Sequence, residues 1–347
     1  MKIEKKIKNK KEIYVGIQLL RILFSFHILV FHCINHLKYQ YKSEIIKFII
    51  NNVAIDLATF FIISFFFSYK CFSSRNIIKI KQRFKRLLIP YIIWPIIFYI
   101  INFQKIKLKS LFYQLLIGNG IHFVFWFQFN IIFIKLIFTI IIFLSKKRFF
   151  IYLFFIGIIC YFIMYYEYYS NFFSKYNQIV VFPIKPINSS YIYSIFGFYL
   201  YTTNIAEKLK KYKKITIILC LIILCLIILC LIILYLYIYY KKLFQSYPYI
   251  IIILNIICSY DLLILFLIFP FENIYNKKFN DIIIKFGNYS AGIYYLHPKI
   301  QLFLLYFSNK MKSRTFIVCI INYLLCNIIC FIGLKIFRNS SLRNLFI

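Results

Sequence analysis

Long apolar runs separated by short polar segments make up almost the whole chain. Most of these runs have about 20 residues or more, the length that an α-helix needs to cross the hydrocarbon core of a bilayer. Ten can be counted, at approximately residues 14–33, 45–67, 87–102, 121–144, 149–168, 189–203, 215–240, 247–270, 286–307 and 314–337. The pattern predicts an all-α, polytopic integral membrane protein with about ten transmembrane helices. It also predicts a single membrane domain over residues 1–347, with no appended soluble domain.

The composition supports this prediction, because 63% of the residues are hydrophobic and only 15% are charged. The formal net charge of +34 could indicate a nucleic-acid-binding protein. However, the Lys and Arg residues form short clusters between apolar runs instead of one basic domain, which is typical of membrane topology. We therefore expect the lipid bilayer as a partner and no nucleic acid.

The distribution of Lys and Arg also predicts the orientation of the spans. With the end residues of the spans counted in, the two tails and alternate loops hold 27 Lys and Arg, whereas the opposite loops hold 12. Cytoplasmic loops carry the excess of positive charge in membrane proteins. We expect a multi-pass protein of the inner (cytoplasmic) membrane with both termini in the cytoplasm.

The first apolar run carries a charged residue and two histidines, Arg21, His27 and His32. An arginine near the centre of a spanning helix costs roughly 2.5–3.5 kcal/mol, so such residues usually face a protein interior and mark function. The step from Arg21 to His32 returns to within about 20° of the same helix face, whereas His27 lies about 120° round. One stripe therefore combines a fixed cation with a group that titrates near neutral pH. The alternative is a snorkelling arginine and a histidine held by a neighbouring helix.

Two further arginines, Arg83 and Arg86, stand just before the third predicted span. Guanidinium groups make paired, charge-assisted hydrogen bonds to phosphate oxygens, so this pair could hold a phosphate-bearing molecule. The alternative is an ordinary positive-inside anchor.

The ninth predicted span begins with Ser290, Tyr294 and His297 at helical offsets that share one stripe. These side chains offer hydrogen bonds and a proton relay inside the membrane, although a histidine that only packs is the alternative. Asp56 is an acid within an apolar run and is expensive there unless paired. Arg21 and Arg83 are its conceivable partners.

The remaining motifs of common enzymes do not occur. Most of the 10 cysteines lie within apolar runs or at their edges, where they are typical of small buried side chains, and no CxxC pair is present. The chain also contains no Walker loop, dinucleotide-binding fingerprint or nucleophile elbow. We expect no metal site and no permanently bound cofactor.

Taken in order, these stretches resemble the acyltransferase 3 family of polytopic membrane acyltransferases over nearly the whole chain. The family's first span carries an arginine and, after ten residues, a histidine, and the other motifs fall on its second, third, fourth and ninth spans. The matching residues are Arg21 and His32; Ile55, Asp56, Leu57 and Ser64; Arg83, Arg86, Leu87, Leu88, Pro90 and Tyr91; Trp126 and Phe127; and Gly287, Ser290, Ile293, Tyr294, Leu296, His297 and Pro298.

Three departures accompany the resemblance. Gln18 stands where the family usually has an acid before the arginine, and Phe65 replaces the usual glycine after Ser64. In the ninth span, the tyrosine, leucine and histidine are out of step by one residue.

The resemblance implies transfer of an acyl group, usually acetyl, from cytoplasmic acyl-CoA to a hydroxyl of a cell-envelope carbohydrate. It implies that His32 is the general base, with Arg21 and His297 beside it as catalytic residues, and that Arg83 and Arg86 hold the donor phosphates. Asp56, Ser290 and Tyr294 are further candidates. The acceptor would be an envelope glycan or a lipid-linked sugar. The competing hypothesis is a transporter or flippase for a lipid-linked sugar or small solute, in which the same polar residues line a permeation path.

Overall fold

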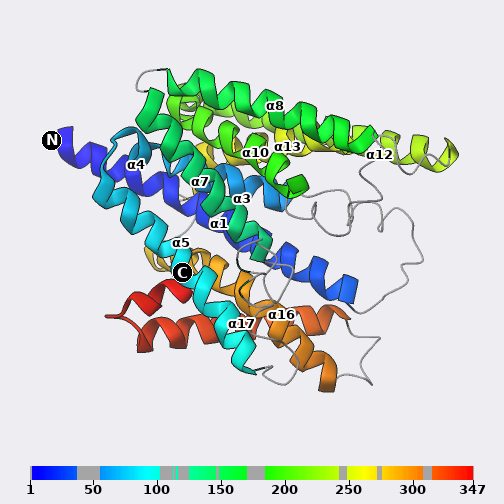
Figure 1. Ribbon diagram of the computed structural model, residues 1–347. Helices are drawn as coiled ribbons and strands as arrows, with labels where there is room; N and C mark the ends of the chain where they lie inside the picture. The colour runs from blue at the N-terminus through cyan, green and yellow to red at the C-terminus, as the bar shows by residue number, and fades with distance from the viewer. Residues whose placement is uncertain are drawn as a thin grey trace. The chain divides into compact units, whose positions relative to one another are not determined.

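The computed structural model describes residues 2–36, 55–101, 112, 115, 125–145, 148–169, 184–241, 248–271, 276–307 and 315–346 (Figure 1). These residues form α-helices and short 3₁₀-helices and no strand, which confirms the all-α prediction. The helices fall into two compact units, residues 1–59 with 204–347 and residues 60–203. Each unit is described by itself below as the first and the second unit.

Each predicted span overlaps a helix. The long helices are α1 (Lys2–His36), α3 (Ile55–Phe66), α5 (Ile77–Ile101), α7 (Phe125–Ser145), α8 (Phe149–Tyr169), α10 (Ile184–Thr202), α12 (Lys213–Lys241), α13 (Pro248–Ile268), α16 (Ser290–Phe307) and α17 (Thr315–Ile336). Shorter helices are α4 (Tyr69–Ser73), α11 (Ile205–Leu209), η1 (Lys210–Tyr212), α15 (Lys277–Asn288) and η3 (Ser341–Leu345). Within the described ranges, six helical segments are long and apolar enough to cross a membrane, which supports a multi-pass protein, while the number of about ten crossings stays a prediction.

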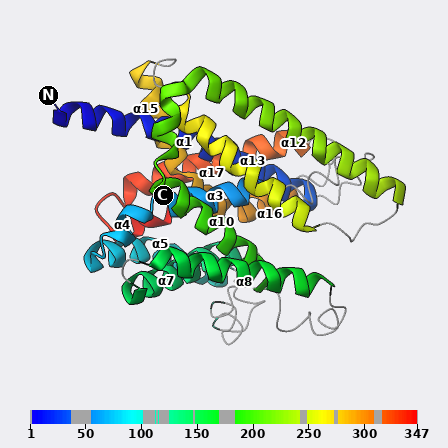
Figure 2. The ribbon, with the colours of Figure 1, turned by 90° about the horizontal axis from the view of Figure 1, so that it is seen from above.

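In the first unit, α1 packs against α13, α15, α16 and α17, and α12 lies alongside α13 (Figure 2). α1 and α16 run in the same direction, because Arg21 contacts Ser290 and, further along both helices, the His32 ring contacts His297. α17 runs the opposite way, since His297 contacts Asn322 while Gly292, earlier on α16, lies against Cys330, later on α17. These directions agree with those expected for the first, ninth and tenth predicted spans.

In the second unit, α7, α8 and α10 pack against one another, and α5 lies against α7 (Figure 1). Aromatic side chains fill the space between these helices. The rings of Phe65 and Phe138 stand 4.9 Å apart, and Phe138 also meets Phe198 and Tyr191 edge-on at 5.0 and 5.4 Å. Edge-to-face contacts of this kind stabilise the unit beyond the burial of the rings alone.

Two differences from the predicted spans affect candidate site residues. α5 begins at Ile77, so Arg83 and Arg86 lie inside this helix and not before it. The reason is a cap that the apolar pattern does not show: the Asn76 side chain accepts a hydrogen bond from the backbone N–H of Lys79. The ninth predicted span is divided at Tyr289, where α15 ends and α16 begins.

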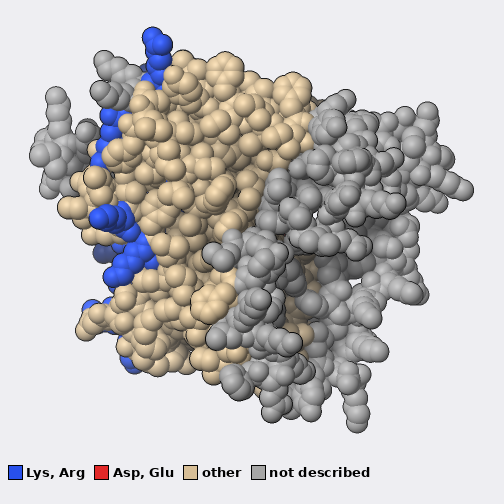
Figure 3. All heavy atoms as spheres, in the orientation of Figure 1, with Lys and Arg blue, Asp and Glu red and all other residues tan. Residues whose placement is uncertain are grey.

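The distribution of side chains on the surface fits a bilayer. On α12, many large apolar side chains are exposed, and few of its residues are buried. In the view of Figure 3, Lys and Arg form small groups, and residues other than Lys, Arg, Asp and Glu make up most of the described surface. Apolar faces of this width are expected where lipid, and not water, surrounds the helices.

Close helix packing in the second unit depends on Gly197, and we predict that Gly197→Ala destabilises the protein by about 1–3 kcal/mol or more. A Cβ atom at Gly197 would lie 2.3 Å from the backbone oxygen of Ile62, which cannot move without shifting α3. Gly157→Ala is the matched control, because its Cβ would meet only the tip of the Ile195 side chain, at 2.5 Å. Thermal unfolding of the purified variants measures the difference. A Gly157 variant less stable than the Gly197 variant would contradict this account.

Candidate active site

A network of hydrogen bonds holds the guanidinium of Arg21 in the first unit. Its Nε donates to the Ser290 hydroxyl at 3.1 Å, and its Nη1 donates to Gln18 Oε1 at 3.2 Å. The Gln18 amide nitrogen in turn donates to Asn288 Oδ1 at 3.2 Å. The cation is therefore oriented by neutral groups on α1, on α16 and at the end of α15.

Gln18, which stands where the family usually has an acid, links Arg21 to Asn288. Its amide oxygen still accepts a hydrogen bond from Arg21, but it supplies no negative charge. Gly287 lets α15 approach α1 this closely, since a Cβ atom there would lie 2.4 Å from Gln18 Oε1 and 2.8 Å from the Gln18 backbone oxygen.

The two candidate histidines His32 and His297 stack on each other, with ring centroids 5.1 Å apart and an angle of 24° between the planes. Gln301 fixes the level of His32 by donating a hydrogen bond to its backbone oxygen at 3.1 Å. A neutral imidazole nitrogen can accept a proton.

His297 is fully buried, with 0% of its surface exposed. Its Nδ1 lies 3.1 Å from the backbone oxygen of Ile293, which can only accept, so Nδ1 carries the hydrogen and donates. The backbone oxygen of His297 accepts a hydrogen bond from Asn322 on α17. The Tyr294 ring stands 6.0 Å from the imidazole. The His297 ring is thus held in one orientation beside His32.

The contacts place Arg21 and His32 at two levels of one helix interface. Ser290 and His297, their partners on α16, are seven residues apart, which corresponds to roughly 10 Å along a helix. Arg21 and His32 themselves are separated by roughly 16 Å along α1. The structure brings each residue to α16, and a cavity shared by the two stays a prediction.

Asp56 pairs with His27, which corrects the expectation that an arginine is its partner. His27 Nδ1 lies 3.2 Å from Asp56 Oδ2, and Asp56 Oδ1 accepts from the backbone N–H of Leu57 at 2.8 Å. The Asp56 side chain is 8% exposed and that of His27 is 53% exposed. Arg21 is committed to Gln18 and Ser290 instead. A histidine held by a buried carboxylate has the arrangement of a general base, so His27 is the alternative to His32 that a comparison of variants must exclude.

Sequence reasoning missed Lys135 on α7. This residue is 3% exposed, its Nζ donates to the Ser64 hydroxyl at 2.9 Å, and it lies 5.4 Å from the centroid of the Phe65 ring. Phe65, the replacement for the family glycine, thus provides a cation–π contact. The sequence did carry a signal, because Lys135 is the one Lys or Arg within the fourth apolar run.

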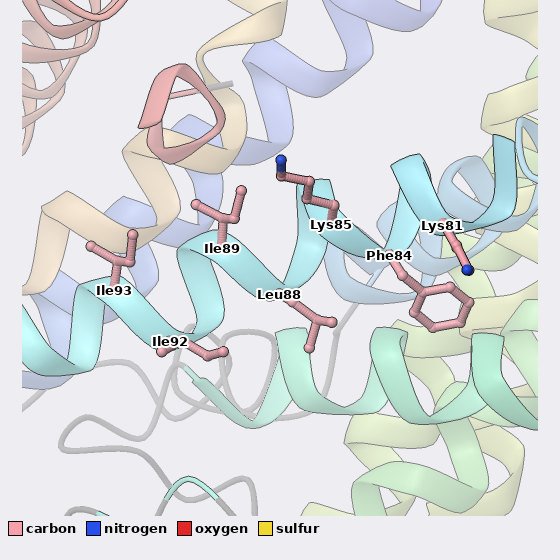
Figure 4. Close-up of a pocket in the computed structure, with 7 residues that line it drawn as sticks. All are labelled: Lys81, Phe84, Lys85, Leu88, Ile89, Ile92 and Ile93. Atoms are coloured by element: carbon pink, nitrogen blue, oxygen red, sulfur yellow. The ribbon is translucent and has the colours of Figure 1, made fainter. Parts of the chain in front are cut away.

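Arg83 and Arg86 differ in their surroundings within the second unit. Arg83 Nη1 donates to the backbone oxygen of Phe67 at 2.6 Å, whereas Arg86 is exposed. An open groove on α5 is lined by other residues: Lys81, Phe84, Lys85, Leu88, Ile89, Ile92 and Ile93. Figure 4 shows the two lysines toward one end of this groove and the isoleucines toward the other. The donor-binding role of Arg83 and Arg86 stays a prediction.

Among the described side chains, no group of three or more His, Cys, Asp or Glu is arranged to hold a metal ion. The polar residues inside the helices are instead joined by hydrogen bonds and ring contacts. Apolar helices that carry a half-buried arginine, Arg21, beside the buried Ser290 and His297 define a multi-pass membrane protein with a polar site within its helices.

The family model described as an acyltransferase domain, acyltransferase 3, matches residues 14–336. The chain belongs to this family and is therefore a membrane acyltransferase. No curated protein and no solved structure gives a significant match.

Proposed function

We propose that the protein transfers an acyl group, acetyl in the simplest case, from cytoplasmic acyl-CoA to a hydroxyl of a cell-envelope carbohydrate. The observation that carries this proposal is the pairing of Arg21 with Ser290 and of His32 with His297 within a chain of the acyltransferase 3 family. Acyl-CoA is then a substrate, and the acceptor is an envelope glycan or a lipid-linked sugar.

In the proposed reaction, His32 is the general base. It takes the proton of the acceptor hydroxyl while the hydroxyl oxygen attacks the thioester carbon of the donor, a role worth roughly 10²- to 10⁴-fold in rate. The carbon–sulfur bond then breaks, and the proton passes to the departing thiolate. Arg21, with Ser290 and Tyr294, supplies positive charge and hydrogen-bond donors for the oxyanion that forms in between.

The donor phosphates are held, in this proposal, by Arg83 and Arg86 near the start of α5. Guanidinium groups suit this role because they bind phosphate oxygens in pairs and stay charged. The Arg83 guanidinium is held by its hydrogen bond to the Phe67 backbone oxygen, and Arg86 is exposed.

The proposed orientation places both termini in the cytoplasm, in the inner membrane. The excess of Lys and Arg on that side supports it. The parallel course of α1 and α16 supports only the part of this orientation that places both termini on one side, because the first and ninth spans should then cross in the same direction. A reporter fused to the C-terminus that is active only outside the cytoplasm would contradict this orientation.

The function is tested by comparing envelope glycans of a deletion strain with those of the parent strain by mass spectrometry. We expect loss of an acyl ester in the deletion strain, restored by the wild-type gene and not by the His32→Ala variant. A transporter of lipid-linked sugars, the competing hypothesis, predicts less glycan at the surface with its ester content unchanged. That outcome would overturn the proposal.

A further inference from the structure

A basic pocket lies in the first unit, where α15, α17 and the C-terminal 3₁₀-helix η3 meet. Its volume is about 580 Å³, within the usual range for small-molecule sites. Four cationic side chains line it, together with a carboxamide and a phenol: Lys285, Lys335, Arg338, Arg343, Asn288 and Tyr289. This pocket is separate from the groove on α5 and contains none of the arginines expected to bind the donor.

The charge of the pocket is one-sided. None of its lining residues is acidic, and Asp281, one turn before Lys285 on α15, is exposed and outside the lining. Lys285 already stands over the ring of Phe331, with Nζ 4.2 Å from the centroid. Cations gathered around a concave surface raise the local concentration of anions and are stabilised when an anion binds. Arginines favour phosphate, because their planar fork matches its oxygens.

The segment that carries Arg343, the 3₁₀-helix η3, is held in place by a cap and by buried side chains. Ser340 caps η3 by accepting a hydrogen bond from the backbone N–H of Leu342. Leu345 at the end of η3 and Phe346 directly after it are buried, and the Phe346 ring stacks on Phe337 at 6.0 Å. Arg343 therefore projects from a segment that is anchored on α17, as a binding site requires.

The pocket is also connected to Arg21 through hydrogen bonds. Asn288 lines the pocket, and its side-chain oxygen accepts a hydrogen bond from Gln18 at 3.2 Å. Gln18 in turn accepts one from Arg21. An anion in the pocket would thus lie beside the residues that orient the candidate catalytic arginine.

We propose that this pocket binds a phosphate-bearing ligand with at least two negative charges. The phosphate groups come either from a soluble molecule such as coenzyme A or from the headgroup of an anionic lipid. The coenzyme A source rests on the proposed acyltransferase reaction, whereas binding of phosphate does not.

The test uses the full chain in nanodiscs of phosphatidylcholine, titrated with coenzyme A and with pyrophosphate. The pocket variant is Arg338→Gln/Arg343→Gln, and Lys208→Gln/Lys211→Gln is the matched control. The control removes the same charge from exposed residues of the same unit, outside the pocket. We expect both probes to raise the unfolding temperature of the wild type and the control. Their affinity for the pocket variant should be about tenfold to a hundredfold weaker.

A second arm adds cardiolipin, whose headgroup carries two phosphates, to the neutral lipid. If the ligand is a lipid headgroup, anionic lipid stabilises the wild type and the control but not the pocket variant, and the soluble probes act equally on all three. Equal responses of the pocket variant and the control to coenzyme A, pyrophosphate and anionic lipid would overturn the proposal. The four side chains that are changed are exposed, so their replacement should leave the fold intact, which unfolding without ligand checks.

Binding is measured without acyl transfer, so the inference and the proposed function fail separately. If no acyl transfer is found, the titrations still decide on the pocket. If Arg83→Ala/Arg86→Ala abolishes binding of coenzyme A while the pocket variant responds to coenzyme A, pyrophosphate and anionic lipid as the wild type does, the donor site stands and the pocket is not a phosphate site.

Discussion

Replacement of His32 by alanine should lower the rate of acyl transfer by on the order of 100-fold or more, because the acceptor hydroxyl would lose its general base. The measurement is transfer from radiolabelled acyl-CoA in membranes, with variants compared at equal amounts of inserted protein. His32 is held between the His297 ring and the hydrogen bond from Gln301, so its removal should affect chemistry more than folding. A His32→Ala enzyme with near wild-type rates would show that the base lies elsewhere.

His27→Asn is the matched control for this experiment. Asparagine can still donate a hydrogen bond to Asp56, so the buried carboxylate keeps a partner while the imidazole is lost. We expect most of the activity to remain, because His27 lies on another face of α1 from His32. If His27→Asn proves the more damaging of the two, the base is His27, oriented by Asp56, and the face of the first helix has been misread.

Arg21→Met should reduce the catalytic constant by roughly 100- to 1,000-fold, the usual cost of removing a group that stabilises an oxyanion. Arg21→Lys should recover only part of this loss, since an ammonium cannot reproduce the fork that contacts both Ser290 and Gln18.

Arg148→Met, at an exposed position between α7 and α8, controls for the loss of charge, and kinetics at saturating acyl-CoA separate turnover from donor binding. A fully active Arg21→Lys variant would show that only a positive charge, and not its geometry, is needed. A fully active Arg21→Met variant would remove Arg21 from the mechanism.

The sequence was sufficient for the parts of the fold that depend on local pattern. Apolar runs predicted the helices because a bilayer demands about 20 apolar residues per crossing. The spacing of Arg21 and His32 predicted a shared face, and both residues indeed contact α16. The offsets of Ser290 and His297 on α16 predicted the complementary stripe in the same way.

The pairings between distant helices could not be predicted from local pattern. Asp56 had two conceivable arginine partners in sequence, and the choice of His27 depends on which turns of α1 and α3 lie at the same level. Lys135 was overlooked because the chain is rich in lysine, so a single lysine in an apolar run carries no functional signal by itself. Its contact with Ser64 is visible only in the structure. The start of α5 at Ile77 was hidden because the side chain of Asn76, and not an apolar repeat, begins the helix.

The long sequence separation between Arg21 and Ser290 has a consequence for how the protein is made. Ser290 is synthesised 269 residues after Arg21, which at usual rates of translation takes roughly 10–50 s. During this interval the arginine is in or near the membrane without its partner on α16. Gln18, three residues away on the same helix, is the partner already present. The residue that departs from the family pattern can therefore shield the cation during insertion, before the helix that completes the site has emerged from the ribosome.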